Sequence, residues 1–310
     1  MDNRGQVLIM TLGVLTVLTL LAINLGHDVS LGLRVDRYYR DKLKAQAMTK
    51  AGFLLATEEL KKDQNDYDAL PETWSTGLDP LTGRLLFDKM EVRRGSGETF
   101  SVGSMLSGDD SVCMVDEERK ININTASLNL LAALFESAGA MDPKALAQGV
   151  LSFRAEAMGS TRQDRKNFMN TQELILIDGM TEDLIRRIEG MVTVYGDGMV
   201  NINTVSESTL GILLKGVARD MSVKDDVAES LATKIIQHRK ASHIYTSRSD
   251  MDIELQGADE TNVYNDLFNR IVFQSDYFLI ETVGEVRGIK AYSAAVYEKQ
   301  KGKIVSWYEE

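Results

Sequence analysis

Few side chains in this 310-residue chain have the types and spacing that catalysis requires. The three histidines are His27, His238 and His243, and none belongs to a metal-binding or nucleophile motif. His238 lies next to Arg239 in a helical pattern, where packing or solvation is the expected role. The single Cys113 has apolar neighbours in a strand-like run, which indicates a buried thiol of low reactivity. These residues predict a protein that is not an enzyme.

The acidic residues are numerous, but no calcium-binding loop is recognisable among them. Asp250, Asp252 and Glu254 alternate as the ligands of such a loop do, yet Leu255 occupies the sixth position, where the loop needs glycine. Surface carboxylates are the better interpretation of this run. The whole chain has 35 Lys and Arg against 46 Asp and Glu, a net charge of −11. This charge disfavours nucleic acid and anionic lipid as partners.

The first element of the chain is an apolar segment long enough to cross a membrane. Residues 7–25 contain no charged side chain, and about 20 helical residues match the roughly 30 Å hydrocarbon core of a bilayer. No small-residue cleavage site follows, as it would in a secretory signal. We expect a transmembrane helix over residues 6–26 that continues as an amphipathic helix to about Gln64. A plain signal anchor is the alternative interpretation of the apolar segment.

A short polar leader, residues 1–5, precedes this helix and ends in Gly5. A glycine directly before an uninterrupted apolar helix resembles the cleavage site of type IV prepilins, which are cut after the glycine on the cytoplasmic side. The resemblance implies that a prepilin peptidase removes the leader. Gln6 then becomes the mature N-terminus, and methylation of its amine is expected.

Met10 occupies the fifth position of the mature chain counted from Gln6. In major pilins this residue is usually a glutamate, which pairs with the buried N-terminal amine of the subunit already in the filament. An unpaired charge in that dry environment costs several kcal/mol. Because Met10 has no carboxylate, the resemblance implies a position at the filament tip. This departure is typical of the K class of minor pseudopilins in type II secretion systems.

Strand patterns flank a middle part that has helical patterns. We expect strands over residues 85–94 and 99–106, joined by a hairpin turn at residues 95–97, and a short third strand over residues 111–115. At the other end, residues 276–309 alternate apolar and polar side chains around turns at residues 287–288 and 301–303.

The helical middle contains an internal repeat. The sequence Asn-Ile-Asn-Thr of residues 122–125 recurs at residues 201–204, and seven identities share the offset of 79 residues. A repeat of this kind indicates two related units. Thr204 with Glu207 forms a capping-box pattern for the next helix, whereas Thr125 is expected to cap alone. A second helix follows in each unit, with Arg154 and Arg239 at matching positions.

These units resemble helix-hairpin-helix and SAM-like folds, some of which bind DNA phosphates at helix N-termini. Residues 118–270 hold 17 basic and 22 acidic residues, and this balance argues against DNA binding. The repeat, the sequence VDEERKININ before it and the joining sequence VTVYGDGMVNINT are similar to the K-class minor pseudopilins.

The predicted fold is therefore α+β and pilin-like, with a long N-terminal transmembrane helix and an antiparallel sheet. Residues 27–117 form the first part of the head, and residues 271–310 form strands that complete its sheet. An α-helical domain, residues 118–270, is inserted between them, with units of about 120–195 and 199–270. The resemblance also implies calcium in the head, and the local candidates for its ligands are the acidic residues Asp109, Asp110, Asp116, Glu117 and Glu118.

The predicted function is assembly at the tip of a periplasmic pseudopilus during protein export. The resemblance implies an inner-membrane anchor in a Gram-negative bacterium, and as partners the I- and J-class minor pseudopilins and the major pseudopilin. The inserted domain offers a surface for secreted substrate or for the outer-membrane channel. Two alternatives stay open, a minor pilin that primes a type IV pilus and a signal-anchored helix-hairpin-helix protein that binds DNA.

Overall fold

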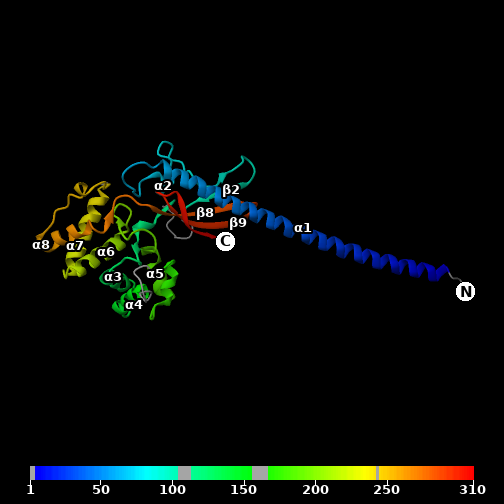
Figure 1. Cartoon of the computed structure of the whole chain (residues 1–310). Helices are drawn as coiled ribbons and strands as arrows, with labels where there is room; N and C mark the ends of the chain where they lie inside the picture. Colours follow the sequence, from blue (N-terminus) through cyan, green and yellow to red (C-terminus); the bar gives the residue numbers. More distant parts are fainter. Residues whose placement is uncertain (1–3, 104–112, 156–166, 242–243) are drawn as a thin grey trace.

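The computed structural model describes residues 4–103, 113–155, 167–241 and 244–310. It consists of a long helix, α1 (Arg4–Lys62), and a head at one end of this helix (Figure 1). We call the projecting part of α1, residues 5–40, the stem, because all its residues are exposed. The head combines an antiparallel sheet with a group of further helices. This architecture confirms the predicted α+β, pilin-like fold class.

The sheet has six strands, in the order β1-β2-β8-β9-β10, and β3 pairs with β8 beyond β2. All its pairs are antiparallel. Its strands are β1 (Met90–Glu91), β2 (Glu98–Val102), β3 (Val115–Asp116), β8 (Tyr277–Val286), β9 (Ile289–Glu298) and β10 (Lys303–Glu309). The turns between β8 and β9 and between β9 and β10 lie where the alternating pattern placed them.

The N-terminal strands are shorter than predicted. Instead of a strand over residues 85–94, only β1 forms, and the hairpin turn to β2 covers residues 92–97. Val92 and Arg93 are exposed. Because no apolar burial stabilises a strand here, the pairing of β1 with β2 ends at Glu91. The expected third strand begins later, at Val115, and residues 104–112 lie outside the described residues.

The second half of α1 packs closely on the sheet because the residues at the contact have small side chains. A methyl group added to Gly284 of β8 would lie 2.0 Å from the carbonyl oxygen of Ala45. Next to this contact, Phe53, Ala56 and Leu60 of α1 are buried in the core of the sheet. A short helix, α2 (Thr73–Thr76), follows α1, and its Trp74 packs edge-on against Phe278.

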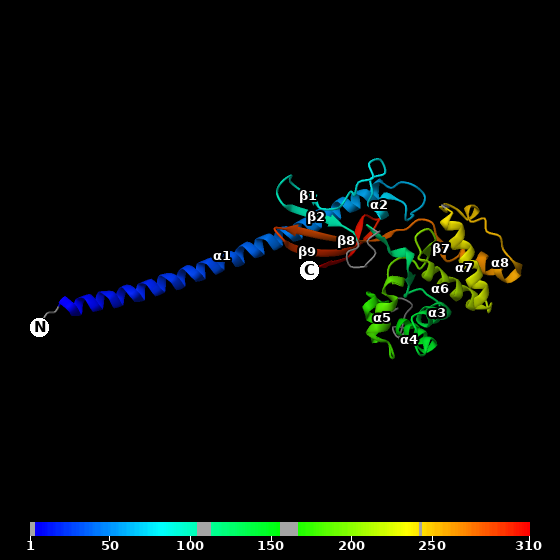
Figure 2. The same cartoon turned by 180° about the vertical axis from the view of Figure 1, so that it is seen from behind.

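The helical elements lie between β3 and β8 in the sequence and form a separate group beside the sheet (Figure 2). The α-helices are α3 (Leu128–Ser137), α4 (Pro143–Ala155), α5 (Glu182–Ile188), α6 (Glu207–Asp220), α7 (Asp225–Lys240) and α8 (Gly257–Leu267). The 3₁₀ helices are η1 (Glu117–Arg119), η2 (Thr171–Leu176), η3 (Glu189–Met191) and η4 (Arg248–Asp250). Two short parallel pairs complete the group, β4 (Ile121–Asn122) with β5 (Val192–Thr193) and β6 (Val200–Asn201) with β7 (Ile271–Val272). One continuous apolar core connects the six α-helices and the two parallel pairs.

The repeated sequences adopt the same local structure. Asn124 exchanges two hydrogen bonds with the backbone of Phe168, at 2.8 and 3.0 Å, and Asn203 does the same with Tyr245, at 2.9 and 2.8 Å. The parallel pairs also correspond, because Ile121 faces Val192 and, 79 residues later, Val200 faces Ile271.

The helix caps differ from the prediction. Ser127 and Ser206 are the N-caps of α3 and α6, and their hydroxyls accept hydrogen bonds from the N–H of Leu130 and Thr209. The capping box of Thr204 with Glu207 is therefore wrong, and so is the cap by Thr125. Both threonines belong to the preceding turn, where their backbone N–H groups donate to the carbonyls of Asn122 and Asn201.

Candidate functional site

The stem has the surface properties of a membrane anchor. In the part of the chain that the structure describes, α1 is the one helix that is long and apolar enough to cross a membrane. The hydroxyls of Thr11, Thr16 and Thr19 donate to the carbonyls of Leu8, Leu12 and Leu15, at 2.9, 2.8 and 2.7 Å. Polar groups satisfied within the helix cost little in lipid.

The predicted processing residues lie at the start of this helix. Gly5 and Gln6 are exposed in its first turn, and a methyl group added to Gly5 would meet no atom within 4 Å. Met10 is 74% exposed on the stem. Cleavage at Gly5, methylation of Gln6 and the role of Met10 stay predictions.

Asp116 lies where the sheet and the helical group meet. One of its carboxylate oxygens accepts hydrogen bonds from Asn201 at 3.1 Å, Thr204 at 2.5 Å and Ser275 at 2.8 Å. The other accepts the backbone N–H of Glu118 at 2.8 Å. Burial raises the pKa of Asp116, and the bonds from Thr204 and Ser275 oppose that shift.

The loop after α1 reaches the same point through Asp68. Its carbonyl accepts from Asn201 at 3.0 Å, and its carboxylate accepts the N–H of Ser275 at 2.7 Å. We call Asp68, Asp116, Asn201, Thr204 and Ser275 the junction cluster; each is at least 95% buried. In the first unit, the equivalent Asn122 donates instead to the carbonyls of residues 195 and 196.

The predicted calcium ligands do not converge in the described structure. The Asp116 carboxylate is surrounded by hydrogen-bond donors, whose partial positive charge is unfavourable for a cation. Glu117 accepts from Thr193 at 2.7 Å and pairs with Lys120 at 2.5 Å. Asp109 and Asp110 lie outside the described residues. Asp116 and Glu117 therefore fit a structural role better than a calcium site, and calcium binding stays a prediction.

The comparisons with known proteins bear on the fold. No protein-family model matches the sequence. No curated protein matches it either. The structure is similar to a chain in the crystal structure of the GspK-GspI-GspJ complex from the enterotoxigenic Escherichia coli type 2 secretion system, with a TM-score of 0.57 and 12% sequence identity. The match covers 90% of this chain and 99% of that chain.

This chain has a pseudopilin-like fold. The length of the match matters, because residues 1–117 and 271–310, which include the long helix and the sheet, make up only about half of the chain, so a match over 90% extends into the helical group. At 12% identity the likeness concerns the fold, and the roles of individual side chains must be argued from their contacts.

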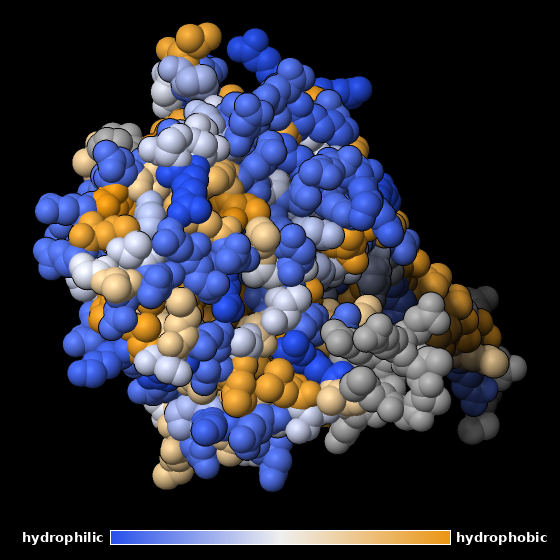
Figure 3. Space-filling model, turned by 60° about the vertical axis from the view of Figure 1, so that its left-hand side comes forward, coloured by the Kyte–Doolittle hydropathy of each residue, from blue (hydrophilic) through white to orange (hydrophobic). Residues whose placement is uncertain are grey.

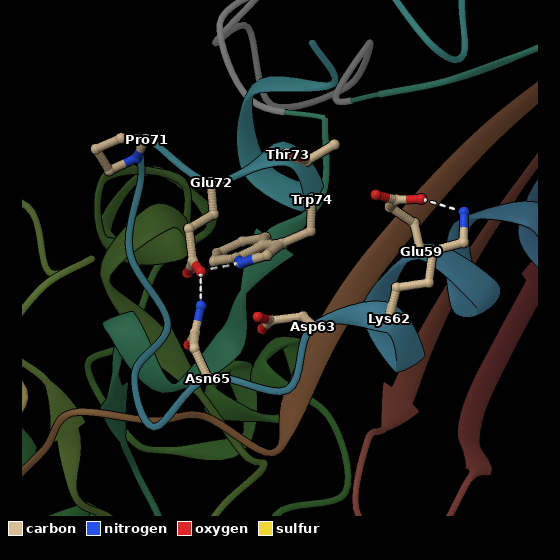
Figure 4. Close-up of a pocket in the computed structure, with 8 residues that line it drawn as sticks. All are labelled: Glu59, Lys62, Asp63, Asn65, Pro71, Glu72, Thr73 and Trp74. Carbon is tan, nitrogen blue, oxygen red and sulfur yellow. Dashed lines mark hydrogen bonds and ion pairs between the residues drawn. The ribbon is translucent and has the colours of Figure 1, made fainter. Parts of the chain in front are cut away.

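An acidic group that the sequence analysis did not single out adjoins a pocket of about 290 Å³ (Figure 4). Carboxylate oxygens of Asp63, Asp68 and Glu72 lie within 4.8 Å of one another. Burial raises the pKa of Asp68 to about 7, and Lys299 opposes the shift. The Lys299 ammonium lies 2.8 Å from Asp63 and 3.0 Å from Asp68, so a lysine already supplies the positive charge. No sequence motif reveals this group, because Lys299 lies more than 230 residues from both acids.

Two of the residues considered for catalysis, His238 and Cys113, have structural contacts, whereas His27 is exposed on the stem and His243 lies outside the described residues. His238 stacks on Tyr245, with ring centroids 5.6 Å apart, and its Nδ1 lies 3.0 Å from the Tyr245 hydroxyl. Cys113 is buried, its Sγ lies 3.6 Å from the carbonyl of Val102, and burial raises its pKa to about 12. These contacts agree with the prediction of packed rather than reactive side chains.

Proposed function

We propose that this chain is a minor pseudopilin of a type II protein secretion system that initiates or caps the tip of the periplasmic pseudopilus. The observation that carries the proposal is the form of α1. This helix begins with a glycine that resembles a prepilin cleavage site, is long and apolar enough to cross a membrane, and ends in a pseudopilin-like head. The role is structural: the chain contributes packing surfaces to a filament rather than catalysis.

Assembly follows from the two ends of the molecule. After cleavage at Gly5, the apolar stem packs among other such helices, and Met10 adapts it to the tip because it offers no carboxylate for a neighbouring amine. The helical group widens the head beyond the sheet (Figure 1). A head of this width hinders the addition of further subunits above it.

The expected partners are I- and J-class minor pseudopilins and the major pseudopilin, in the inner membrane with the head in the periplasm. The similarity to a chain of a GspK-GspI-GspJ complex supports this choice. DNA binding is disfavoured because residues 63–310 hold 26 basic against 40 acidic residues.

The mass of the mature N-terminal peptide, from hosts with and without prepilin peptidase, tests the proposal. We expect a methylated peptide that begins at Gln6 and disappears without the peptidase. An intact Met1 in both hosts would contradict the proposal. Co-purification with I- and J-class subunits, rather than with type IV pilus subunits, then distinguishes the secretion system from the pilus.

A further inference from the structure

Helix α1 and the rest of the molecule carry opposite net charges. α1 has nine Lys and Arg against five Asp and Glu, a net charge of +4. Residues 63–310 have 26 against 40, a net charge of −14. The distal face of the head, over the helical elements, is mainly hydrophilic, with small scattered apolar patches (Figure 3). The distribution of charge along the molecule is therefore uneven, with an acidic head and basic residues near the stem.

Further basic residues lie where the sheet meets the stem. Glu98 pairs with Val286 in the register of β2 and β8, so the β1–β2 and β8–β9 turns lie at the same end of the sheet. α1 leaves the head at this end (Figure 2), where Lys44 binds Glu98 at 2.6 Å. The turns carry basic residues, and so does the last exposed part of the stem. We call this set the basic rim: Arg37, Arg40, Arg93, Arg94, Arg287 and Lys290.

The stem arginines face the same side as these turns. Asp41 contacts Arg287 of the β8–β9 turn at 3.6 Å, and Lys44 contacts the start of β2. Arg37 precedes Asp41 by four residues, and Arg40 precedes Lys44 by four, so each lies one turn below a residue that touches the sheet. The rim residues therefore lie at one end of the sheet, on the underside of the head.

The rim is exposed and largely unneutralised. All six side chains belong to exposed residues. Arg287 pairs with Asp41, and the other five have no ion-pair partner among the residues that the structure describes. The acids at this end are Asp36, Asp41, Glu91, Glu98 and Glu285, five against the six rim residues and Lys44, and Glu91 accepts the N–H of Gly95 at 2.7 Å. Excess positive charge at this edge points to a partner with negative charge.

Membrane lipid is too far away to be that partner when the stem stands along the membrane normal. At 1.5 Å per residue, Arg37, the rim residue nearest the membrane along α1, lies about 18 Å beyond Leu25, where the apolar segment ends. The headgroup layer is about 5–8 Å deep. The remaining separation of about 10 Å for Arg37, and more for the other rim residues, exceeds the screening length of roughly 8 Å at physiological salt.

We propose that the basic rim docks on an acidic upper surface of the pseudopilin one step nearer the membrane in the filament. This proposal rests on the proposed function. The underside of the head is the surface that meets a subunit below it, and opposite charges there favour association and set its orientation. Acidic side chains on the upper face of the lower subunit are therefore the expected counterpart.

The test compares full-length chains in detergent for binding to a purified pair of I- and J-class minor pseudopilins. The rim variant is Arg37→Glu, Arg40→Glu and Arg94→Glu; Arg287 and Lys290 stay because they face Asp41 and Glu285. The matched control makes the same charge change at other exposed residues, Arg84→Glu, Lys144→Glu and Lys224→Glu. We expect the rim variant to bind about tenfold or more weakly and the control to bind as the wild type does.

Salt and lipid measurements separate the outcomes. Binding of the wild type should weaken as NaCl rises, with a smaller effect on the rim variant. Equal affinity of the rim variant and the wild type overturns the rim proposal alone. Rim-dependent binding to phosphatidylglycerol vesicles, or to a second copy of this chain, with partner binding unchanged also overturns it. If the wild type itself forms no complex with the pair, the proposed function fails.

Discussion

Asp116 shows how one buried carboxylate can connect segments that are far apart in the sequence. Its hydrogen bonds reach Asn201 and Ser275, 85 and 159 residues away. The sequence identified Asp116 as an acidic candidate but not its partners, because polar contacts over such distances leave no local pattern. Asp68 was missed for the same reason. At the residue scale, the sequence thus located one member of the junction cluster and not the partners that surround it.

Replacing Asp116 by alanine is expected to lower the free energy of unfolding by about 3–5 kcal/mol. The change leaves the buried donors of Asn201, Thr204 and Ser275 without their acceptor. Denaturant unfolding of the full chain in detergent measures the loss. Asp178→Ala, at an exposed carboxylate, is the control and should change stability by less than about 0.5 kcal/mol. Equal losses in the two variants would contradict this role.

Cys113 should resist alkylation in the folded protein. Burial raises its pKa to about 12, so almost no thiolate forms at pH 8. We expect iodoacetamide to react about 100-fold more slowly with the native chain than with the chain in denaturant, where the pKa returns to about 8.5. Peptide mass measurement over time gives both rates. Rapid modification of the native protein would show that the thiol is accessible.

Among the elements, α1 has two different environments along its length. The stem is exposed on all sides, whereas the second half lies against β8, β9 and β2 and buries residues such as Ala45 and Phe53. The close approach depends on Gly284, which leaves room for the backbone of α1. Attachment of α1 to the sheet therefore depends on small residues at the contact as much as on buried apolar side chains.

Gly284→Ala is expected to weaken this attachment. Its methyl group would overlap the Ala45 carbonyl oxygen at 2.0 Å, and overpacking of this kind costs about 1–3 kcal/mol. Thermal unfolding and protease sensitivity of α1 measure the effect. Gly211→Ala in α6, where an added methyl group meets no atom within 4 Å, should instead raise stability by up to about 1 kcal/mol. A neutral Gly284→Ala would mean that the helix can shift without cost.

The sequence predicted the elements best where a pattern repeats. The duplicated Asn-Ile-Asn-Thr sequence marked two stretches that form matching contacts with Phe168 and Tyr245. Helix starts were placed two residues early, since Ser127 and Ser206 cap instead of the threonines. Strand lengths near β1 were overestimated, because alternation alone does not show whether an apolar face has anything to cover.

At the scale of the whole molecule, an apolar stem, a basic rim and an acidic head follow one another along the long axis. The pseudopilin-like fold thus has an apolar, a basic and an acidic surface at successive positions along its length. The sequence predicted the anchor and the net charge. It did not predict the rim, since Arg40, Arg94 and Lys290 belong to elements that only the folded sheet brings together.

Met10→Glu is expected to change how many copies of the chain enter a filament. A carboxylate at the fifth mature position can pair with the N-terminal amine of a neighbouring subunit, which removes the proposed restriction to the tip. We expect more than one copy per pseudopilus, counted by quantitative mass spectrometry of sheared filaments. Met10→Leu is the control and should leave the count unchanged. One copy in both variants would show that another feature fixes the position.

The unbroken course of α1 from Arg4 to Lys62 also has a mechanical consequence. A helix of 59 residues is about 88 Å long, and about 55 Å of it lies beyond Leu25. In the proposed function, α1 acts as a lever whose pivot is in the bilayer. A tilt of only about 10° at the pivot sweeps the far end through roughly 10 Å, well within the tilt range of membrane helices. An unassembled head therefore searches a wide arc, and neighbouring helices in a filament end that search.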